Sequence, residues 1–433
     1  MQFRTPSPES RNQNPVTNVV RLVLAAAAVQ GVAFLSLPLL QRWCYGPEDF
    51  ADFALYSQWA GLFGAVATFR MDLAVVKHEN ARLANAAFSN GLRALLATIC
   101  LSFFVVLGFH WTNSAMGSVE GLWIWLPLGV AGLGLSNLGT AWLTRHERFA
   151  LVARFRGWGG GMGEALRFAF SGLAGAGLIA GRVLGQWLTA IMAIRHFRQD
   201  QQTEEKPTRE ERLTAWRIDR DYVRYTTPAN LLAMGANALL VLFLFESAPR
   251  DTVGQVGAAA AYLTVASGLL IRGANDVFFR LLNDIPDRQL TRLYIRWALS
   301  LMGLASAGAA VLHLLPLDWV VLLLGDRWSD LLPVMRIFCL WMIPWVAASS
   351  LSGIFPHLRR QSWSLVLDVF HLCLIGGWLI WFSSSQDAVG LGDWTIIRQY
   401  AWVQSGFYGV ALCAGVLACV LGTRKPPPPP QAE

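Results

Sequence analysis

Runs of about twenty mostly apolar residues recur along the whole chain, and no other feature constrains its fold as strongly. The hydrocarbon core of a bilayer is about 30 Å thick and is crossed by roughly 20 residues of α-helix. With 54% hydrophobic and 15% charged residues, the chain is too apolar for a soluble protein of this length. The sequence therefore predicts an all-α integral membrane protein. The expected spans are about twelve, near 19–40, 50–69, 84–109, 120–142, 151–171, 174–194, 226–245, 254–276, 292–314, 332–353, 363–383 and 399–421.

Motifs of soluble enzymes and metal sites are absent from the sequence. The six cysteines show no CxxC spacing, the seven histidines are scattered, and there is no Walker loop or HExxH motif. The first twenty residues are polar and contain no short apolar core with a cleavage site, so the first run is expected to remain as a span. We expect no catalytic residue, no metal and no cofactor.

Lysine and arginine predict the orientation, because cytoplasmic loops of membrane proteins are enriched in them. If the N-terminus is cytoplasmic, the predicted outside loops hold only Arg42, Arg250, Arg327 and Arg398. Both termini are therefore expected in the cytoplasm. The outside loops are short, which argues against a membrane-embedded transferase or ligase with a sizeable acceptor-binding loop.

The longest polar segment, 198–222, divides the predicted spans into six plus six. It carries acidic and basic side chains that cancel, which is typical of a solvated linker. The expected organisation is a cytoplasmic tail at 1–18, an N-lobe at 19–197, this charged cytoplasmic linker, a C-lobe at 223–421 and a proline-rich tail at 422–433. Even span numbers in both halves are the arrangement of parallel repeats.

Charged residues inside the predicted spans are candidates for function, because each costs roughly 2.5 to 3.5 kcal/mol near the bilayer centre on insertion scales. Arginines outnumber carboxylates among them, which suits an anionic substrate and especially phosphate. A pump for cationic drugs would be expected to show the opposite balance. The arginines are Arg21, Arg93, Arg167, Arg182, Arg272 and Arg336, and the carboxylates are Glu164, Asp276 and Asp368.

Three pairs share a helix face and leave two interpretations open. Glu164 with Arg167 and Arg272 with Asp276 are either structural ion pairs or parts of a site, in which Glu164 and Asp276 are candidates for ion or proton coupling. Asp368 and His371 are either hydrogen-bonded structure or groups that carry an ion or proton in a coupled transporter.

Arg70 and Asp72 lie at the predicted cytoplasmic end of the second span. Two residues apart on one helix, their side chains would point about 200° apart, so they would not neutralise each other.

The stretch Tyr45–Asn80 resembles the polysaccharide flippases of the multidrug/oligosaccharidyl-lipid/polysaccharide exporter superfamily. An aromatic-x-Pro-acidic stretch leads into the second span, which ends in Arg-x-acidic-x-Ala. The matching residues are Tyr45, Pro47, Glu48, Arg70, Asp72 and Ala74. Looser likenesses continue in order along the chain, around Pro228, Trp328 and Pro333. Ala51 and Arg280 depart from the family, at positions where glycine and proline are usual.

The resemblance implies two six-helix lobes around a central cavity that opens alternately to the two sides of the bacterial cytoplasmic (inner) membrane. The implied cargo is an undecaprenyl-pyrophosphate-linked oligosaccharide for surface polysaccharide, with the pathway's polymerase and glycosyltransferases as partners. Arg70 and Asp72 would then lie at the inner gate, where we expect Asp72 to hold a neighbouring helix or loop.

On this hypothesis a set of cavity cations holds the pyrophosphate. These are Arg21, Arg93, Arg167, Arg182 and Arg272. The alternatives are a drug or small-solute antiporter of the same superfamily, a transferase or ligase of the same pathway, and a structural partner of the polysaccharide machinery.

Overall fold

The computed structural model describes residues 30–112, 114, 117, 119, 121–201, 207–358, 360–384 and 393–422, and no strand occurs among them. They form helices that separate into two compact units. The first unit comprises residues 1–45 with 59–228, and the second comprises 46–58 with 229–433. The division thus falls after Pro228, beyond the predicted linker, and the first part of the second predicted span belongs with the later half.

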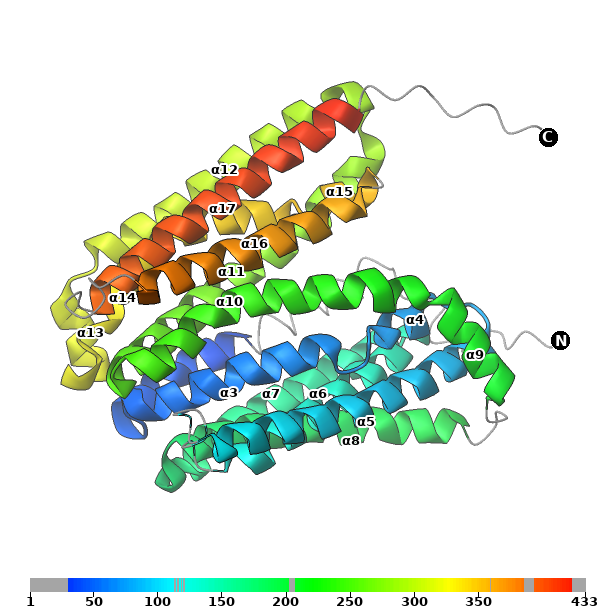
Figure 1. Cartoon of the computed structure of the whole chain (residues 1–433), viewed down its shortest axis with the longest axis horizontal. Helices are drawn as coiled ribbons and strands as arrows, with labels where there is room; N and C mark the ends of the chain where they lie inside the picture. Colours follow the sequence, from blue (N-terminus) through cyan, green and yellow to red (C-terminus); the bar gives the residue numbers. More distant parts are fainter. Residues whose placement is uncertain are drawn as a thin grey trace. The chain divides into compact units, whose positions relative to one another are not determined.

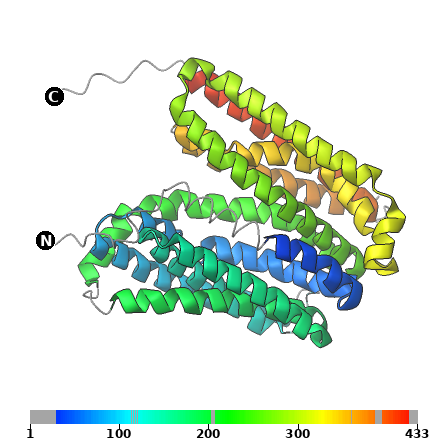
Figure 2. The same ribbon diagram turned by 180° about the vertical axis from the view of Figure 1, so that it is seen from behind.

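The first unit is built on long helices that pack side by side (Figure 1). A helix that ends at residue 43 comes first among the described residues. Helix α8 packs on both α6 and α7, and α5 packs on α6; the view from behind shows these helices running alongside one another (Figure 2). The elements are α3 (Pro47–Val66, shared between the units), α4 (Met71–Lys77), α5 (Ala81–Trp111), α6 (Leu122–Arg145), α7 (Phe149–Ala169), α8 (Ala174–Gln201) and α9 (Arg209–Ile218).

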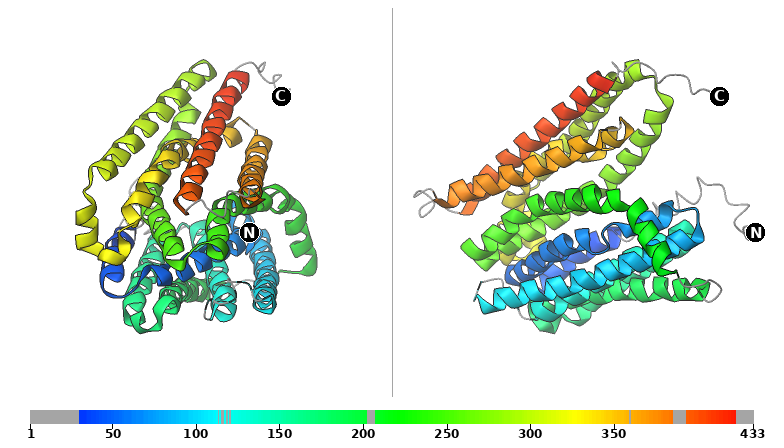
Figure 3. Two further views of the ribbon diagram at one scale, coloured as in Figure 1. Left: turned by 60° about the vertical axis from the view of Figure 1, so that its left-hand side comes forward. Right: turned by 45° about the vertical axis from the view of Figure 1, so that its right-hand side comes forward.

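In the second unit, α14 packs against α11, α12 and α17 (Figure 3). A core of side chains that includes Phe278 and Tyr294 fills this bundle. The elements are α10 (Thr227–Ser247), α11 (Arg250–Asp284), α12 (Asp287–Leu314), α13 (Leu317–Leu324), α14 (Leu331–Ser350), α15 (Ile354–His357), α16 (Gln361–Ser384) and α17 (Asp393–Gly422).

Prolines mark where three helices of the second unit begin. Pro249, Pro286 and Pro316 occupy the N-cap positions of α11, α12 and α13. Proline is tolerated there because the first N–H groups of a helix have no partner within it, so the missing donor costs nothing.

Within the described residues, nine helices are long and apolar enough to cross a membrane, or ten if the bent pair α3 and α4 counts as one span. The predicted span 19–40 is described only from residue 30. The predicted span 151–171 is α7, which carries Arg154, Arg156, Glu164 and Arg167 and is therefore too charged to be counted on composition alone. An all-α membrane fold is confirmed, and twelve spans stay a prediction compatible with it.

The second predicted span is not one continuous helix, which corrects the geometry expected for Arg70 and Asp72. Helix α3 ends at Val66, and α4 begins at Met71 after a bend of 47°. Phe69 and Arg70 both adopt left-handed backbone, with φ of 48° and 58°. Left-handed backbone costs a residue with a Cβ about 1 to 2 kcal/mol, so this break is strained.

Asp72 stabilises the break itself instead of holding another helix or loop. Its Oδ1 accepts a hydrogen bond of 2.7 Å from the Thr68 hydroxyl, across the two left-handed residues. Arg70 occupies the N-cap of α4, and its Nε is buried without a hydrogen-bond partner among the described residues.

The charged segment between the predicted halves is not solvated throughout. Residues 209–218 form α9, which begins with a capping box: the Thr208 hydroxyl accepts from the Glu211 N–H, and the Glu211 carboxylate accepts from the Thr208 N–H. Helix α9 packs on α5, and its residue Ala215 is buried.

Candidate functional site

Glycines bring α7 and α8 into backbone contact. A Cβ on Gly185 would overlap the carbonyl oxygen of Gly159 and lie 2.9 Å from the Gly163 Cα. A Cβ on Gly181 would lie 2.8 Å from the backbone nitrogen of Arg167. This close packing of small residues four apart is the usual way for membrane helices to associate. Because glycine contributes no side chain, the polar residues beside it define the space between the helices.

A pocket of about 220 Å³ lies along this seam and is bounded by α6, α7 and α8. Of the described residues, three arginines line it, Arg156 and Arg167 from α7 and Arg182 from α8, together with one carboxylate, that of Glu164. The other polar side chains are Ser136, Gln186 and Thr189. Arg156 and Arg167 are eleven positions apart along α7, so at 1.5 Å per residue these cations span about 16 Å, half the thickness of the hydrocarbon core.

At one end of the pocket, Arg167 and Glu164 form an ion pair of 2.8 Å between Nη1 and Oε1. Arg167 is only 6% exposed, whereas Arg156 and Arg182 are exposed. The Ser36 hydroxyl donates a hydrogen bond of 2.8 Å to the other carboxylate oxygen, so both oxygens of Glu164 are engaged. The Tyr45 hydroxyl donates 2.6 Å to the Arg167 carbonyl oxygen, which fixes the backbone of this turn.

The structure brings only some of the predicted cavity cations together. Arg167 and Arg182 share the pocket just described. Arg93 lies on α5 in a separate pocket of the first unit, against α9. Arg272 is an exposed residue of α11 in the second unit, and Arg21 lies outside the described residues.

Two further charged residues of the predicted spans are Asp276 and Arg336. The side chain of Asp276 is outside the described residues, so its pairing with Arg272 stays a prediction. Arg336 donates hydrogen bonds to the carbonyl oxygens at the end of α12, the shortest being 2.7 Å to Leu315.

His371 is paired with glutamine, not with the predicted Asp368. Its Nε2 donates to Oε1 of Gln404 at 2.8 Å, and its ring stacks on Phe407 with centroids 3.8 Å apart. The donor role follows because the Gln404 amide nitrogen already donates to the Tyr400 hydroxyl. Asp368 is half-buried nearby on α16 with no hydrogen bond to another described residue.

Arg156 is not among the site residues predicted from the sequence, although its spacing from Arg167 places it on the same face of α7. Positions 156, 159, 163 and 167 follow the helical period, so Arg156 and Arg167 lie on the same face of α7 with glycines between them. Guanidinium groups of the kind found on this face match phosphate oxygens in pairs. Within the described part of the chain, no cluster of three or more His, Cys, Asp or Glu side chains could hold a metal ion.

Comparison with known proteins identifies the fold. No family model matches the chain, and no curated protein matches it. Among solved structures, an inward-facing multidrug resistance MATE family transporter of the MOP superfamily matches with a TM-score of 0.70 at 14% identity, covering 95% of this chain and 100% of that one. This chain has the MATE transporter fold.

Two further solved structures give the same result. An outward-facing multidrug resistance MATE family transporter matches with a TM-score of 0.57 at 16% identity, covering 98% of this chain and 100% of that one. A MATE structure in complex with MaL6 matches with a TM-score of 0.61 at 14% identity, covering 95% of this chain and 98% of that one. At such low identity the MATE likeness describes the fold and leaves the substrate open.

Proposed function

We propose that this chain exports a lipid-linked oligosaccharide across the bacterial cytoplasmic membrane, with its pyrophosphate bound by the α7–α8 pocket. The observation that carries the proposal is the line of Arg156, Arg167 and Arg182 along a seam of two helices in a transporter fold. Among the described residues that line the pocket, three arginines accompany one carboxylate, and that carboxylate pairs with Arg167.

The physical demand of such a cargo matches this pocket. A pyrophosphate with sugars cannot cross hydrocarbon unaided, since each unpaired polar group costs several kilocalories and charges cost more. Cations spaced along about 16 Å of α7 offer successive positions for the anion as it crosses. The polyprenyl chain, being apolar, needs no polar passage and remains in the lipid.

Alanine variants of the two exposed pocket arginines test the proposal in a strain that lacks the chromosomal copy of the gene. Arg156→Ala and Arg182→Ala should reduce surface polysaccharide and cause lipid-linked sugars to accumulate in the inner leaflet, measured by mass spectrometry of extracted lipids. Matched controls are Arg154→Ala, on another face of α7, and Arg195→Ala, on α8 outside the pocket. Full export by both pocket variants at normal membrane levels would overturn the proposal.

A second candidate is antiport of cationic drugs, and two observations favour it. The matching solved structures include multidrug resistance transporters, and Asp368 on α16 is a half-buried carboxylate without a hydrogen-bonded partner among the described residues. This function predicts that expression protects a pump-deficient strain against ethidium, and that Asp368→Asn removes the protection while Arg182→Ala does not. The export proposal predicts no protection against ethidium. It predicts instead that Arg182→Ala lowers surface polysaccharide and that Asp368→Asn does not.

A further inference from the structure

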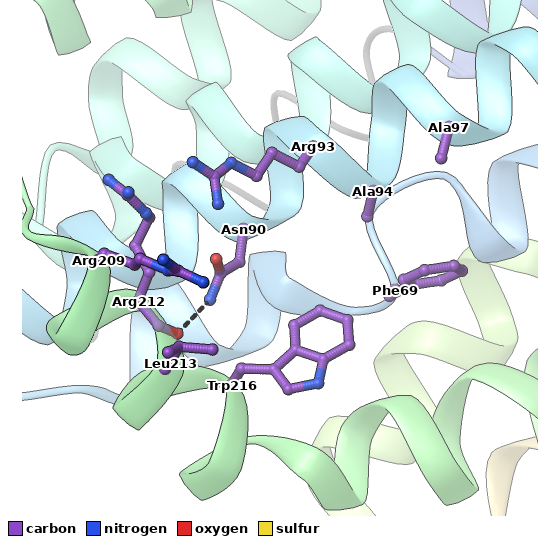
Figure 4. A pocket seen from close by; sticks show the side chains of 9 residues that line it. All are labelled: Phe69, Asn90, Arg93, Ala94, Ala97, Arg209, Arg212, Leu213 and Trp216. Carbon is purple, nitrogen blue, oxygen red and sulfur yellow. Dashed lines mark hydrogen bonds between the residues drawn. The ribbon is translucent and has the colours of Figure 1, made fainter.

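A second cationic pocket of the first unit lies where α9 packs on α5, apart from the α7–α8 pocket. It encloses about 410 Å³. Figure 4 shows the guanidinium groups of Arg93, Arg209 and Arg212 on one side and the rings of Phe69 and Trp216 on the other. None of the described residues that line it is acidic.

The pocket is held in shape by contacts along the whole length of α9. Near its beginning, Arg82 and Glu211 are 3.6 Å apart, and the Asn90 amide donates 2.9 Å to the Arg212 carbonyl oxygen. At its end, the C-cap residue Asp219 pairs with His78, the C-cap of α4, at 2.7 Å.

These contacts leave the guanidinium side of the pocket under-compensated. Three like charges face a common space that no described carboxylate lines, so an anion placed among them relieves their repulsion. The Nε of Arg212 is buried and makes no hydrogen bond to another described residue. Guanidinium groups present their donors in a planar fork that fits phosphate oxygens.

The aromatic side of the pocket indicates a lipid. Trp216 and Phe69 meet edge to face, with centroids 6.4 Å apart, and aromatic residues are enriched at the level of lipid headgroups. Leu213, Trp216 and Ile218 are exposed on a helix whose other residues, apart from the buried Ala215, are polar, as in helices that lie in the membrane interface. Helix α5 is a candidate span, so α9 packs beside the first turns of a membrane helix.

We infer that this α5–α9 pocket binds the phosphate-bearing headgroup of an anionic membrane lipid. The three arginines hold the phosphate, and the two aromatic rings cover the glycerol or first-sugar region next to it. Because two of the cations belong to α9 and the third to α5, the bound lipid holds α9 against α5 within the first unit. This inference goes beyond the proposed export function, since it concerns a lipid that is bound without being transported.

Native mass spectrometry of the full-length protein, released from detergent with added lipid, tests the inference. The probes are phosphatidylglycerol, the zwitterionic phosphatidylcholine, undecaprenyl pyrophosphate and inorganic phosphate. Phosphatidylglycerol should bind at least about tenfold more tightly than phosphatidylcholine, because about 1.4 kcal/mol of charge-assisted hydrogen bonding gives that factor. The preference should fall by a similar factor in the Arg209→Gln/Arg212→Gln double variant.

Two controls keep the result interpretable. Arg154→Gln/Arg195→Gln removes the same charge from the same unit outside the pocket and should leave the preference unchanged. The double variant could lose binding simply because α9 unfolds, and hydrogen exchange of α9 reports such unfolding. Arg93 lies on the long helix α5, so Arg93→Gln removes a pocket cation without changing α9 and should also weaken binding.

The competition arms identify the source of the phosphate. Displacement of phosphatidylglycerol by undecaprenyl pyrophosphate means that the pocket also accepts a carrier lipid, and its absence means a resident phospholipid; both support lipid binding. Equal binding by pocket and control variants, or binding of inorganic phosphate alone, would overturn the inference. Since no transport is measured, these outcomes are independent of the export experiment.

Discussion

Replacing Glu164 by glutamine is the most informative single perturbation of the α7–α8 pocket. Glutamine keeps the shape of the side chain and an oxygen that can accept from Ser36, but it removes the charge that pairs with Arg167. Arg167 then stays 6% exposed in a pocket whose other charged residues, Arg156 and Arg182, are also cations.

The magnitude follows from the 2.8 Å separation of the two charged groups. Coulomb's law with an effective dielectric constant of about 20 gives ~6 kcal/mol of attraction, part of which offsets the cost of removing both groups from water. Removal of one partner of a buried pair typically costs about 3 to 5 kcal/mol, because the other charge is left without compensation. We expect Glu164→Gln to destabilise the first unit by that amount.

The assay is a double-mutant cycle with Glu164→Gln, Arg167→Gln and the double variant, measured as reversible unfolding in mixed micelles by dodecyl sulfate. The double variant should be more stable than the sum of the single changes predicts, by about 2 kcal/mol or more, because neither charge is then stranded. Additive effects, or a Glu164→Gln variant within about 0.5 kcal/mol of the wild type, would refute the argument.

Three further changes probe other contacts. Gly185→Ala should destabilise the first unit by about 1 to 3 kcal/mol, since its Cβ meets the α7 backbone. Gly161→Ala, with open space around it, should be neutral or slightly stabilising in the same dodecyl sulfate unfolding assay. Gln404→Leu should lower the free energy of unfolding by about 1 to 3 kcal/mol, because it leaves the imidazole N–H of His371 without an acceptor. An unchanged melting temperature would contradict this hydrogen bond. Thr208→Ala should lower the stability of α9 by about 1 kcal/mol, seen as faster hydrogen exchange of that helix alone. The Thr208 N–H lowers the pKa of the Glu211 carboxyl below its ordinary value. The carboxylate half of this cap is therefore complete above the unfolded-state pKa and is lost as the pH falls through the lower folded-state pKa. Protection factors of α9, which are corrected for the intrinsic pH dependence of exchange, should fall in acid, and unchanged protection factors would argue against the cap.

The sequence predicts the helices of this fold well because apolar length is a local property of the chain. It did not predict the break after α3, since Phe69 and Arg70 carry no glycine-like signal for left-handed backbone. The strain there is compensated by packing of α4 on α5 and α6, which is tertiary information.

The candidate site was predictable only in part. Arg167 and Arg182 stood out as charges within apolar runs, and both line the pocket. Their separation from Arg93 depends on which helices pack together, and no pattern in a single sequence reports that. The helix α9, in contrast, was readable from Thr208 followed by Glu211, a capping box that the cancelling charges of the segment concealed.

The glycine seam also has a consequence for how the protein is made. On insertion scales each central charge adds roughly 2.5 to 3.5 kcal/mol, so α7, with four charged residues, is a poor substrate for the insertion machinery by itself. Helix α8 follows after only a short turn and is apolar enough to span the bilayer. The two helices should therefore enter the membrane together as a hairpin, with α8 supplying the apolar surface. Helix α7 should then insert only after α8 has left the ribosome.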